Sequence, residues 1–438
     1  MPSKHVAIVG GGMAGLAAAC SLAERSIKTT LFEAAPQLGG RTRRVEYKGL
    51  KLDNGQHILL GAYRETLRLL KLASVDESKV LQRLPLALNM RSSSTLHSVS
   101  LSTCRHLPAP FHLLFGFMFA KGLPLKSRVV AIKLMCWLKL QRFKLAQDVP
   151  LSEFLQSKGQ TPALIDYLWE PLCLAALNTP IEQASAQVFC NVLRDSFAKK
   201  KQDSDLLLPR VDLSTLLAEP LSDYLTAHGG EVKLNHIVQK IQNTTLTIKD
   251  ENLTFSHVII ACAPHQLDKL GMSNYPFSYQ PITTIYLQYA EDVKLPQAMV
   301  GLVDGISQWV FDRGQLCGQA GLVAVIISAH APFEITQVAL AEKVSAELAV
   351  VFPHLNAPIW HKVITEKRAT FSCEPALARP IVFLEKNVYL AGDYVTSGDT
   401  YSDYPATIES AVRSGIAAAA YISTPLSMIE STYMKALT

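Results

Sequence analysis

The segment most indicative of the fold is His5-Val6-Ala7-Ile8-Val9-Gly10-Gly11-Gly12-Met13-Ala14-Gly15. A short apolar run that ends in glycines is typical of a buried strand followed by a tight turn. The apolar residues of 16–23 then recur at helical spacing, and Lys28 to Glu33 forms a second apolar run. The sequence therefore predicts a strand–helix–strand unit and a parallel sheet at the N-terminus.

The glycines fit the pattern G-x-G-x-x-G at the strand-to-helix turn. Gly10 permits the tight turn, Gly12 lets a pyrophosphate approach the backbone, and Gly15 lets helix and strand pack closely. The N-terminus of the helix, at Met13 and Ala14, stabilises the phosphate charge. We therefore predict a dinucleotide-binding turn.

Glu33 ends the second strand, where its carboxylate can accept hydrogen bonds from the hydroxyls of an adenosine ribose. A carboxylate in that place repels a 2′-phosphate and therefore disfavours NADP. Because the strand, the helix, the second strand and the acidic residue follow in the expected order, the glycine pattern strongly indicates a dinucleotide-binding turn.

The composition narrows the class of protein. A chain of 438 residues exceeds the usual size of a single core, so two domains are expected. Half of the residues are apolar, but no run approaches the roughly 20 apolar residues that span a bilayer. The glycines at 10–12 break the N-terminal apolar run, which argues against a signal peptide and for a protein that stays inside the cell. The His and Cys spacings predict no metal.

Positive charge is concentrated in one segment. Between Glu77 and Asp148 there are eleven Lys and Arg residues and no acidic residue. Phe and Leu alternate with these basic residues, notably in 111–119, which suits an anionic membrane surface better than nucleic acid. We predict peripheral membrane contact through 105–147 and no binding of nucleic acid. The alternative is a core helix with an exposed basic edge.

Further along, residues 63–213 have a mainly helical pattern, and 229–255 show short alternating runs. His257 to Ala261 and Val388 to Ala391 are further buried strands. The last of these ends at Gly392-Asp393, before a helix at about 406–421.

A second glycine element distinguishes FAD from NAD. Leu38-Gly39-Gly40-Arg41 follows Glu33, and residues 387–393 and 409–415 form a strand, Gly-Asp and a helix. The sequence here resembles the FAD-dependent amine oxidase and phytoene desaturase superfamily. The resemblance implies that Gly40 and Arg41 lie along the flavin and pyrophosphate, and that Gly392 and Asp393 meet the ribityl chain or pyrophosphate. It also implies that Thr407 and Ile408 meet the flavin pyrimidine and that Val238 meets the adenine.

These features together predict an α/β fold in which a Rossmann-type FAD-binding domain is interleaved with a mixed α+β substrate domain. We assign residues 1–62, 215–270 and 385–438 to the first domain, and 63–214 and 271–384 to the second. The second contains the helical, membrane-facing region.

Four longer segments, 52–63, 168–180, 204–214 and 366–371, resemble the hydroxysqualene dehydroxylases, also called squalene-associated FAD-dependent desaturases. That family removes the hydroxyl of hydroxysqualene reductively, giving squalene for hopanoid synthesis. The resemblance implies non-covalent FAD, a C30 isoprenoid substrate, and a cytoplasmic enzyme at the inner face of the membrane; the oligomeric state stays open. Residues 394–404 are longer than the family pattern.

Within this resemblance, Gly55 and Gln56 lie beside the cofactor and His57 is the preferred proton donor, since His titrates nearest neutral pH. A histidine that merely packs or bonds to backbone is the alternative. Lys367 is predicted to contact the flavin through water, or else is a solvated lysine. Trp169, Leu172 and Leu174 either line a substrate tunnel or belong to the core.

Three other functions compete. A carotenoid-type desaturase uses the same cofactor in the oxidative direction. An amine oxidase is disfavoured because nothing C-terminal resembles its aromatic cage. A non-catalytic lipid carrier is disfavoured because Glu33, Gly40, Arg41 and Asp393 are all present.

Overall fold

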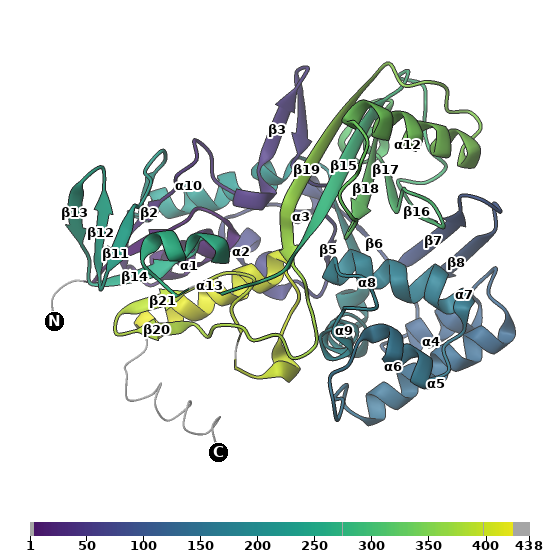
Figure 1. Ribbon diagram of the computed structural model, residues 1–438, viewed down its shortest axis with the longest axis horizontal. Coiled ribbons are helices and arrows are strands. Elements are labelled where there is room, and N and C mark those ends of the chain that lie inside the picture. Colours follow the sequence, from purple (N-terminus) through teal and green to yellow (C-terminus); the bar gives the residue numbers. More distant parts are fainter. Residues whose placement is uncertain (1–3, 274, 397, 424–438) are drawn as a thin grey trace.

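The computed structural model describes residues 4–273, 275–396 and 398–423. Residues 1–3 and 424–438, at the outer ends of the predicted FAD-binding segments, lie outside the described residues, as do 274 and 397. Figure 1 shows three parts: a sheet with long helices on the left, a second sheet at the upper right, and a group of helices at the lower right.

The first sheet has six strands and contains the N-terminal unit. The order is β10-β2-β1-β14-β21-β20, parallel except for β20. Helix α1 (Met13–Ala23) packs against α13 (Ile408–Ser423), where the α13 glycine Gly415 lies against the carbonyl of Ala14. The near-continuous apolar strands suit a parallel sheet covered by helices. Its strands are β1 (His5–Val9), β2 (Lys28–Phe32), β10 (Glu231–Lys233), β14 (His257–Ile260), β20 (Phe383–Glu385) and β21 (Val388–Leu390).

The second sheet has seven strands and is antiparallel apart from the β7–β16 pair. Helix α12 (Gln337–Val351) packs on it through the buried residues Leu340, Val344 and Leu348. In order, its strands are β19 (Trp360–Phe371), β15 (Tyr279–Gln288), β18 (Leu322–Ser328), β17 (Trp309–Asp312), β16 (Met299–Val303), β7 (Ala87–Ser92) and β8 (Ser98–Ser102).

The prediction that 63–213 is mainly helical is wrong for residues 81–102, which form β6, β7 and β8. In β7 the side chains of Leu88 and Met90 are buried while Asn89 and Arg91 are only partly so, which is the period of two of a strand. On either side of these strands the helical pattern is correct, apart from the short strand at Leu206–Pro209. The helices there are α2 (Arg64–Leu72), α3 (Glu77–Val80), α4 (Phe111–Met118), α5 (Leu125–Leu140), α6 (Leu151–Ser157), α7 (Pro162–Leu164), α8 (Glu170–Leu177) and α9 (Ala186–Leu193).

Smaller elements connect these parts. They are the sheet of β11 (Lys240–Gln242), β12 (Thr245–Ile248) and β13 (Glu251–Thr254), the pair β3 (Arg44–Tyr47) and β4 (Leu50–Asp53), the sheet of β5 (Leu59–Leu60), β9 (Leu206–Pro209) and β6 (Leu81–Leu84), and helices α10 (Glu219–Ala227) and α11 (Arg313–Cys317). Within the described part of the chain, none of the helices combines the length and apolar character needed to cross a bilayer.

Candidate active site

The glycine turn has the geometry of a dinucleotide cradle. Gly10 has φ of 112°, which a residue with a side chain rarely adopts. A Cβ at Gly15 would overlap the carbonyl oxygen of Gly10, so glycine is needed for α1 to pack against the turn. By contrast, a Cβ at Gly12 would meet nothing within 4 Å. The space beside Gly12, at the N-terminal end of α1 with Met13 and Ala14, is therefore open to a ligand.

Glu33 lies directly against this turn. Its carboxylate accepts hydrogen bonds from the backbone N–H groups of Gly11, at 2.6 Å, and Ala35, at 2.8 Å. Gly12 caps α1 without a side-chain hydrogen bond, so the N-terminus of the helix keeps donors for a phosphate.

The second glycine element closes over the first. The N–H of Gly39 donates to the carbonyl of Gly11, and a Cβ at Gly40 would lie 3.3 Å from the Cα of Gly12. Arg41 then extends toward the end of β21: its guanidinium is 2.7 Å from the carboxylate of Asp393 and 2.7 Å from the carbonyl of Ala369.

Asp393 follows β21, which pairs with β14, the neighbour of β1. Because carboxyl ends of parallel strands share one edge, Asp393 and the glycine turn lie at the same edge of the sheet. Asp393 is 5% exposed, and Gly392 is held by its N–H, which donates to the hydroxyl of Ser414. The structure thus brings Gly10–Gly15, Glu33, Gly40, Arg41 and Asp393 into one continuous site.

Val238 comes two residues after a segment that contacts the end of β2. The chain before it runs along the end of β2, where the N–H groups of Asn235 and His236 donate to the carbonyls of Ala35 and Glu33. Val238 itself is buried.

Thr407 and Ile408 begin α13. The hydroxyl of Thr407 accepts from the N–H of Ser410, and the N–H of Thr407 donates to the hydroxyl of Ser410. This reciprocal pair fixes the first turn of α13. Glu409 binds α2 instead, accepting from the N–H groups of Glu65 and Thr66.

A model of proteins described as flavin containing amine oxidoreductases matches residues 13–423. The chain belongs to the flavin-containing amine oxidoreductase family.

Among curated members similar to this chain, the hydroxysqualene dehydroxylase of Zymomonas mobilis is 27% identical over 434 residues, covering 94% of this chain and 97% of the relative. The hydroxysqualene dehydroxylase of Rhodopseudomonas palustris is 28% identical and covers 95% and 98%. The zeta-carotene desaturase of Zea mays is 22% identical and covers 96% and 84%. The resemblance to hydroxysqualene dehydroxylases is thereby confirmed over nearly the whole chain.

Solved structures agree in fold. An oxidoreductase from Methanosarcina mazei superposes with a TM-score of 0.73 at 14% identity, covering 96% of this chain and all of that chain. A triple mutant of putrescine oxidase, made for redesign of cofactor binding, gives 0.70 at 16% identity and covers 96% and 98%. At these identities the likeness defines the fold alone, which is that of FAD-binding oxidoreductases with mixed α and β content.

The residues of this flavin-containing family member fit FAD. The open space at Gly12 and the uncapped N-terminus of α1 suit a pyrophosphate, and the Glu33 carboxylate beside the turn would accept from a ribose hydroxyl. Further along the same edge of the six-stranded sheet lie the positive guanidinium of Arg41 and the negative carboxylate of Asp393.

His57 follows β4, in the loop that also holds Gly55 and Gln56. Its Nδ1–H donates to the carbonyl of Gly55 at 2.5 Å, so in the neutral ring the other nitrogen is an acceptor. Burial lowers the pKa of His57 below its ordinary value of 6.5, and Arg41 lowers it further. His57 is therefore mostly neutral at pH 7. The sequence had suggested His57 as the proton donor because the ordinary pKa of histidine is close to 7.

Lys367 is exposed on β19, next to Glu366, which accepts a hydrogen bond from the amide of Asn54 at 3.1 Å. This contact brings the strand that carries Lys367 to the loop that carries His57.

Sequence reasoning missed a buried ion pair under that loop. Arg313 lies 3.1 Å from Asp53 and donates at 2.5 Å to the Oε1 of Gln56. The hydroxyl of Tyr286 donates to the carbonyl of Asp53. With its oxygen held by Arg313, the buried Nε2 of Gln56 has no partner among the described residues. The only sequence signal was the place of Arg313 directly after an apolar strand.

Trp169 and Leu172 line an apolar cavity beneath α4, together with nine other apolar residues; Leu174 is not among them. Its free space is about 10 Å³, so it is a gap in the packing rather than a tunnel. In the described ranges no group of three His, Cys, Asp or Glu residues could hold a metal ion.

Proposed function

We propose that this protein is an FAD-dependent hydroxysqualene dehydroxylase, which reductively removes the hydroxyl of hydroxysqualene to give squalene. The observation that carries the proposal is the similarity to hydroxysqualene dehydroxylases over 94–95% of the chain. The cradle for FAD and the His57 loop at the end of β4 supply the groups that this reaction requires.

The reaction splits into two balanced steps. A proton and the hydroxyl leave as water, which breaks the C–O bond and leaves an allylic cation on the substrate. FAD, bound non-covalently and in its reduced form, would supply the hydride and hence the two electrons that the carbon of the broken C–O bond gains. The protein must therefore deliver one proton and exclude water from the cation.

In this proposal, the protonated form of His57 delivers the proton from the nitrogen that does not bond to Gly55. Gln56, fixed by Arg313, keeps an N–H group for an acceptor oxygen in the site. Lys367 contacts the flavin through water. We assign the cofactor contacts to Gly10, Gly12, Met13, Ala14, Gly15, Glu33, Gly40, Arg41, Gly55, Gln56, Val238, Gly392, Asp393, Thr407 and Ile408.

The test is anaerobic incubation of chemically reduced enzyme with hydroxysqualene. We expect squalene, with the new hydrogen traceable to the flavin when the reduction is done with deuterated reductant in D₂O. Formation of no squalene from a reduced, fully loaded enzyme would overturn the proposal.

The second candidate is a carotenoid-type desaturase, favoured by the 22% identity to zeta-carotene desaturase over 96% of the chain. Oxidised enzyme mixed with squalene or phytoene distinguishes the two, because only a desaturase would reduce its flavin with these hydrocarbons.

We also propose the division into an FAD-binding domain of 1–62, 215–270 and 385–438 and a substrate domain of 63–214 and 271–384. The two large sheets support it, since the strands of the first come from the former segments, apart from β20, which begins at Phe383.

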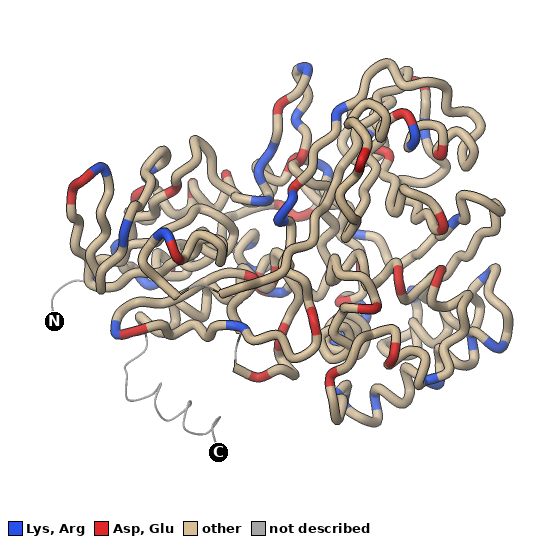
Figure 2. Tube along the Cα trace, in the orientation of Figure 1, with Lys and Arg blue, Asp and Glu red and all other residues tan. Residues whose placement is uncertain are grey.

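Finally, we propose that α4 and α5 rest on the inner face of an anionic membrane. Large apolar side chains are exposed on both helices and between them: Phe111, Phe115, Met118, Phe119, Leu125, Val129 and Leu140. The charged residues of this region are Lys and Arg, which appear blue along α5 at the lower right of Figure 2. Apolar side chains beside basic ones are what binding to an anionic bilayer surface requires. Co-sedimentation with anionic vesicles that weakens as salt rises would support this contact, and equal binding to neutral vesicles would contradict the electrostatic part.

A further inference from the structure

A basic pocket opens at the surface where the chain enters α4. It has a volume of about 420 Å³ and lies between two segments distant in sequence, 106–109 and 199–202. One side is formed by the apolar residues Leu107, Pro108 and Ala109, together with His106. The other side is formed by Lys199, Lys200, Lys201 and Gln202. Lys201 connects the two sides, since its ammonium donates to the carbonyl of Arg105 at 2.6 Å.

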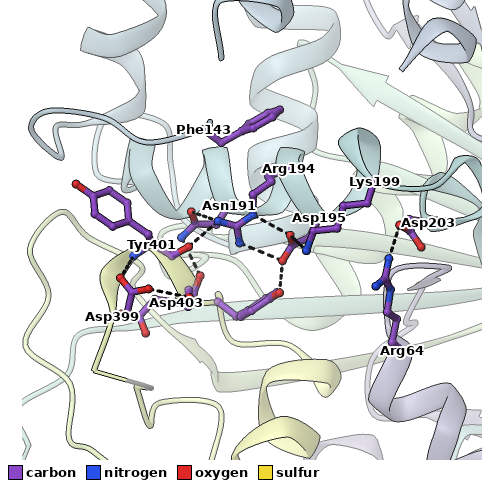
Figure 3. A network of polar contacts seen from close by, with 12 residues as sticks. Arg64, Phe143, Asn191, Arg194, Asp195, Lys199, Asp203, Asp399, Tyr401 and Asp403 are labelled. Carbon is purple, nitrogen blue, oxygen red and sulfur yellow. Dashed lines mark hydrogen bonds and ion pairs between the residues drawn. The ribbon is translucent and has the colours of Figure 1, made fainter. Parts of the chain in front are cut away.

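The carboxylates around this pocket are each neutralised by an arginine. Asp195 is bound by Arg194 through two hydrogen bonds of 2.8 and 3.2 Å, and it also accepts from Tyr404. Figure 3 shows Asp195 enclosed in this way, with Lys199 beside it at 2.6 Å. The hydrogen bonds from Arg194, Lys199 and the Tyr404 hydroxyl hold the pKa of Asp195 well below its usual range, so this carboxylate remains charged and fully paired.

The other two carboxylates are arranged alike. Asp203 lies 2.8 Å from Arg64, and Asp205 lies 3.2 Å from Arg83. Figure 3 shows Arg64 pointing toward Asp203. Three arginines and Lys199 thus balance these three carboxylates and Glu77, which shares Arg83, and Lys200 and Lys201 add positive charge in excess. The pocket therefore has the charge of an anion site.

The pocket is continuous with the apolar surface of α4. Phe111, the first residue of α4, comes two positions after Ala109 and is 58% exposed. Phe115 and Phe119 follow at intervals of four, which places the three rings along one face of the helix, and the last two rings lie 4.4 Å apart. A cationic pocket therefore adjoins the start of an exposed aromatic stripe. A phospholipid has the matching order, with its phosphate next to the acyl chains.

We propose that the pocket lined by 106–109 and 199–202 binds the phosphate group of an anionic phospholipid while the Phe111–Phe115–Phe119 stripe enters the acyl region below it. This inference rests on the proposed membrane contact of α4 and α5 and specifies the headgroup that the contact recognises. It separates recognition of the headgroup, by the lysines, from insertion, by the aromatic rings.

The test compares binding of the FAD-loaded protein to phosphatidylglycerol and phosphatidylcholine vesicles. The variant Lys200→Gln/Lys201→Gln keeps the Lys199–Asp195 pair, and we expect its affinity for phosphatidylglycerol vesicles to fall about 25-fold, since each lysine at an anionic surface contributes about five-fold. Lys240→Gln/Lys249→Gln removes the same charge from the exposed β11–β13 sheet at the other end of Figure 1 and should change affinity less than two-fold.

A third variant separates this inference from the proposal on which it rests. Phe115→Ser/Phe119→Ser should weaken binding to both kinds of vesicle. If it does and the pocket variant binds like its control, the phosphate pocket is wrong and the membrane contact stands. If neither variant weakens binding, both proposals are wrong.

Millimolar inorganic phosphate, at constant ionic strength, should not release the protein from vesicles. Release would assign the pocket to free phosphate and overturn the lipid assignment. Flavin content and thermal unfolding verify that each variant is folded.

Discussion

The guanidinium of Arg313 lies 3.1 Å from the carboxylate of Asp53, and both side chains are 1% exposed. Arg313 begins α11, beyond the seven-stranded sheet, whereas Asp53 ends β4 and precedes the loop of Gln56 and His57. Asp53 also accepts the N–H of Leu213 at 2.8 Å. One buried ion pair therefore joins the loop of the candidate active site to two distant segments of the chain.

Arg313→Met should destabilise the protein by about 3–5 kcal/mol, because it leaves the Asp53 carboxylate buried without its partner. Adding Asp53→Asn should recover part of that loss, since asparagine can still accept from Leu213 and carries no charge. Urea unfolding at one fixed FAD concentration measures both variants. Arg210→Met, at an exposed arginine, is the control. Equal stability of the Arg313 variant and this control would contradict the role of the pair.

The two glycines of the turn should respond differently to alanine. Gly15→Ala forces a Cβ into the carbonyl of Gly10, so we expect loss of both stability and FAD binding. Gly12→Ala meets no protein atom within 4 Å, so the apoprotein should keep its melting temperature while FAD binding is lost. Thermal unfolding without FAD and FAD titration distinguish these outcomes. Full flavin content in Gly12→Ala would show that the pyrophosphate does not approach that residue.

Asp393→Ala removes the carboxylate that pairs with Arg41 and is proposed to bind FAD. Loss of a charge-assisted hydrogen bond costs about 1.5–3 kcal/mol, so the dissociation constant for FAD should rise roughly 10- to 150-fold. Flavin fluorescence on dilution measures it. The matched control is Asp268→Ala, at an exposed aspartate outside the FAD cradle. Retention of FAD equal to that of the control after dilution would exclude Asp393 from the cofactor site.

The pH dependence of turnover tests His57 as the proton donor. Because burial lowers its pKa below 6.5, only a small fraction is protonated at pH 7. The rate of a single turnover of reduced enzyme should therefore rise as pH falls below about 6.5 and level off once His57 is protonated. His57→Gln should retain FAD, react about 100-fold more slowly and lose this pH dependence. His228→Gln, at an exposed histidine, should leave the profile unchanged. A normal rate and profile in His57→Gln would remove His57 from the reaction.

Much of the cofactor site could be predicted from the sequence because its signals are local. The strand, the glycine turn, α1 and Glu33 fall within 30 residues, and each residue type is required by backbone geometry or phosphate chemistry at that spacing. Gly392-Asp393 could be assigned in the same way, from a buried strand that ends at the pair. The prediction of secondary structure from local patterns was less reliable at 81–102, because the short strands there lie within a longer segment that was predicted to be mainly helical.

Local sequence patterns were therefore enough to predict the Rossmann-type unit, the flavin family and the basic, aromatic character of α4 and α5. The packing of distant segments was needed to show that Arg313 supports the loop of His57, that burial lowers the pKa of this histidine, and that the lysines of 199–201 face the segment 106–109. Each of these depends on contacts between segments that are far apart in sequence. Burial and charge pairing are properties of the packed chain, so no local pattern of residues specifies which arginine meets Asp53 or which carboxylates leave Lys200 and Lys201 in excess.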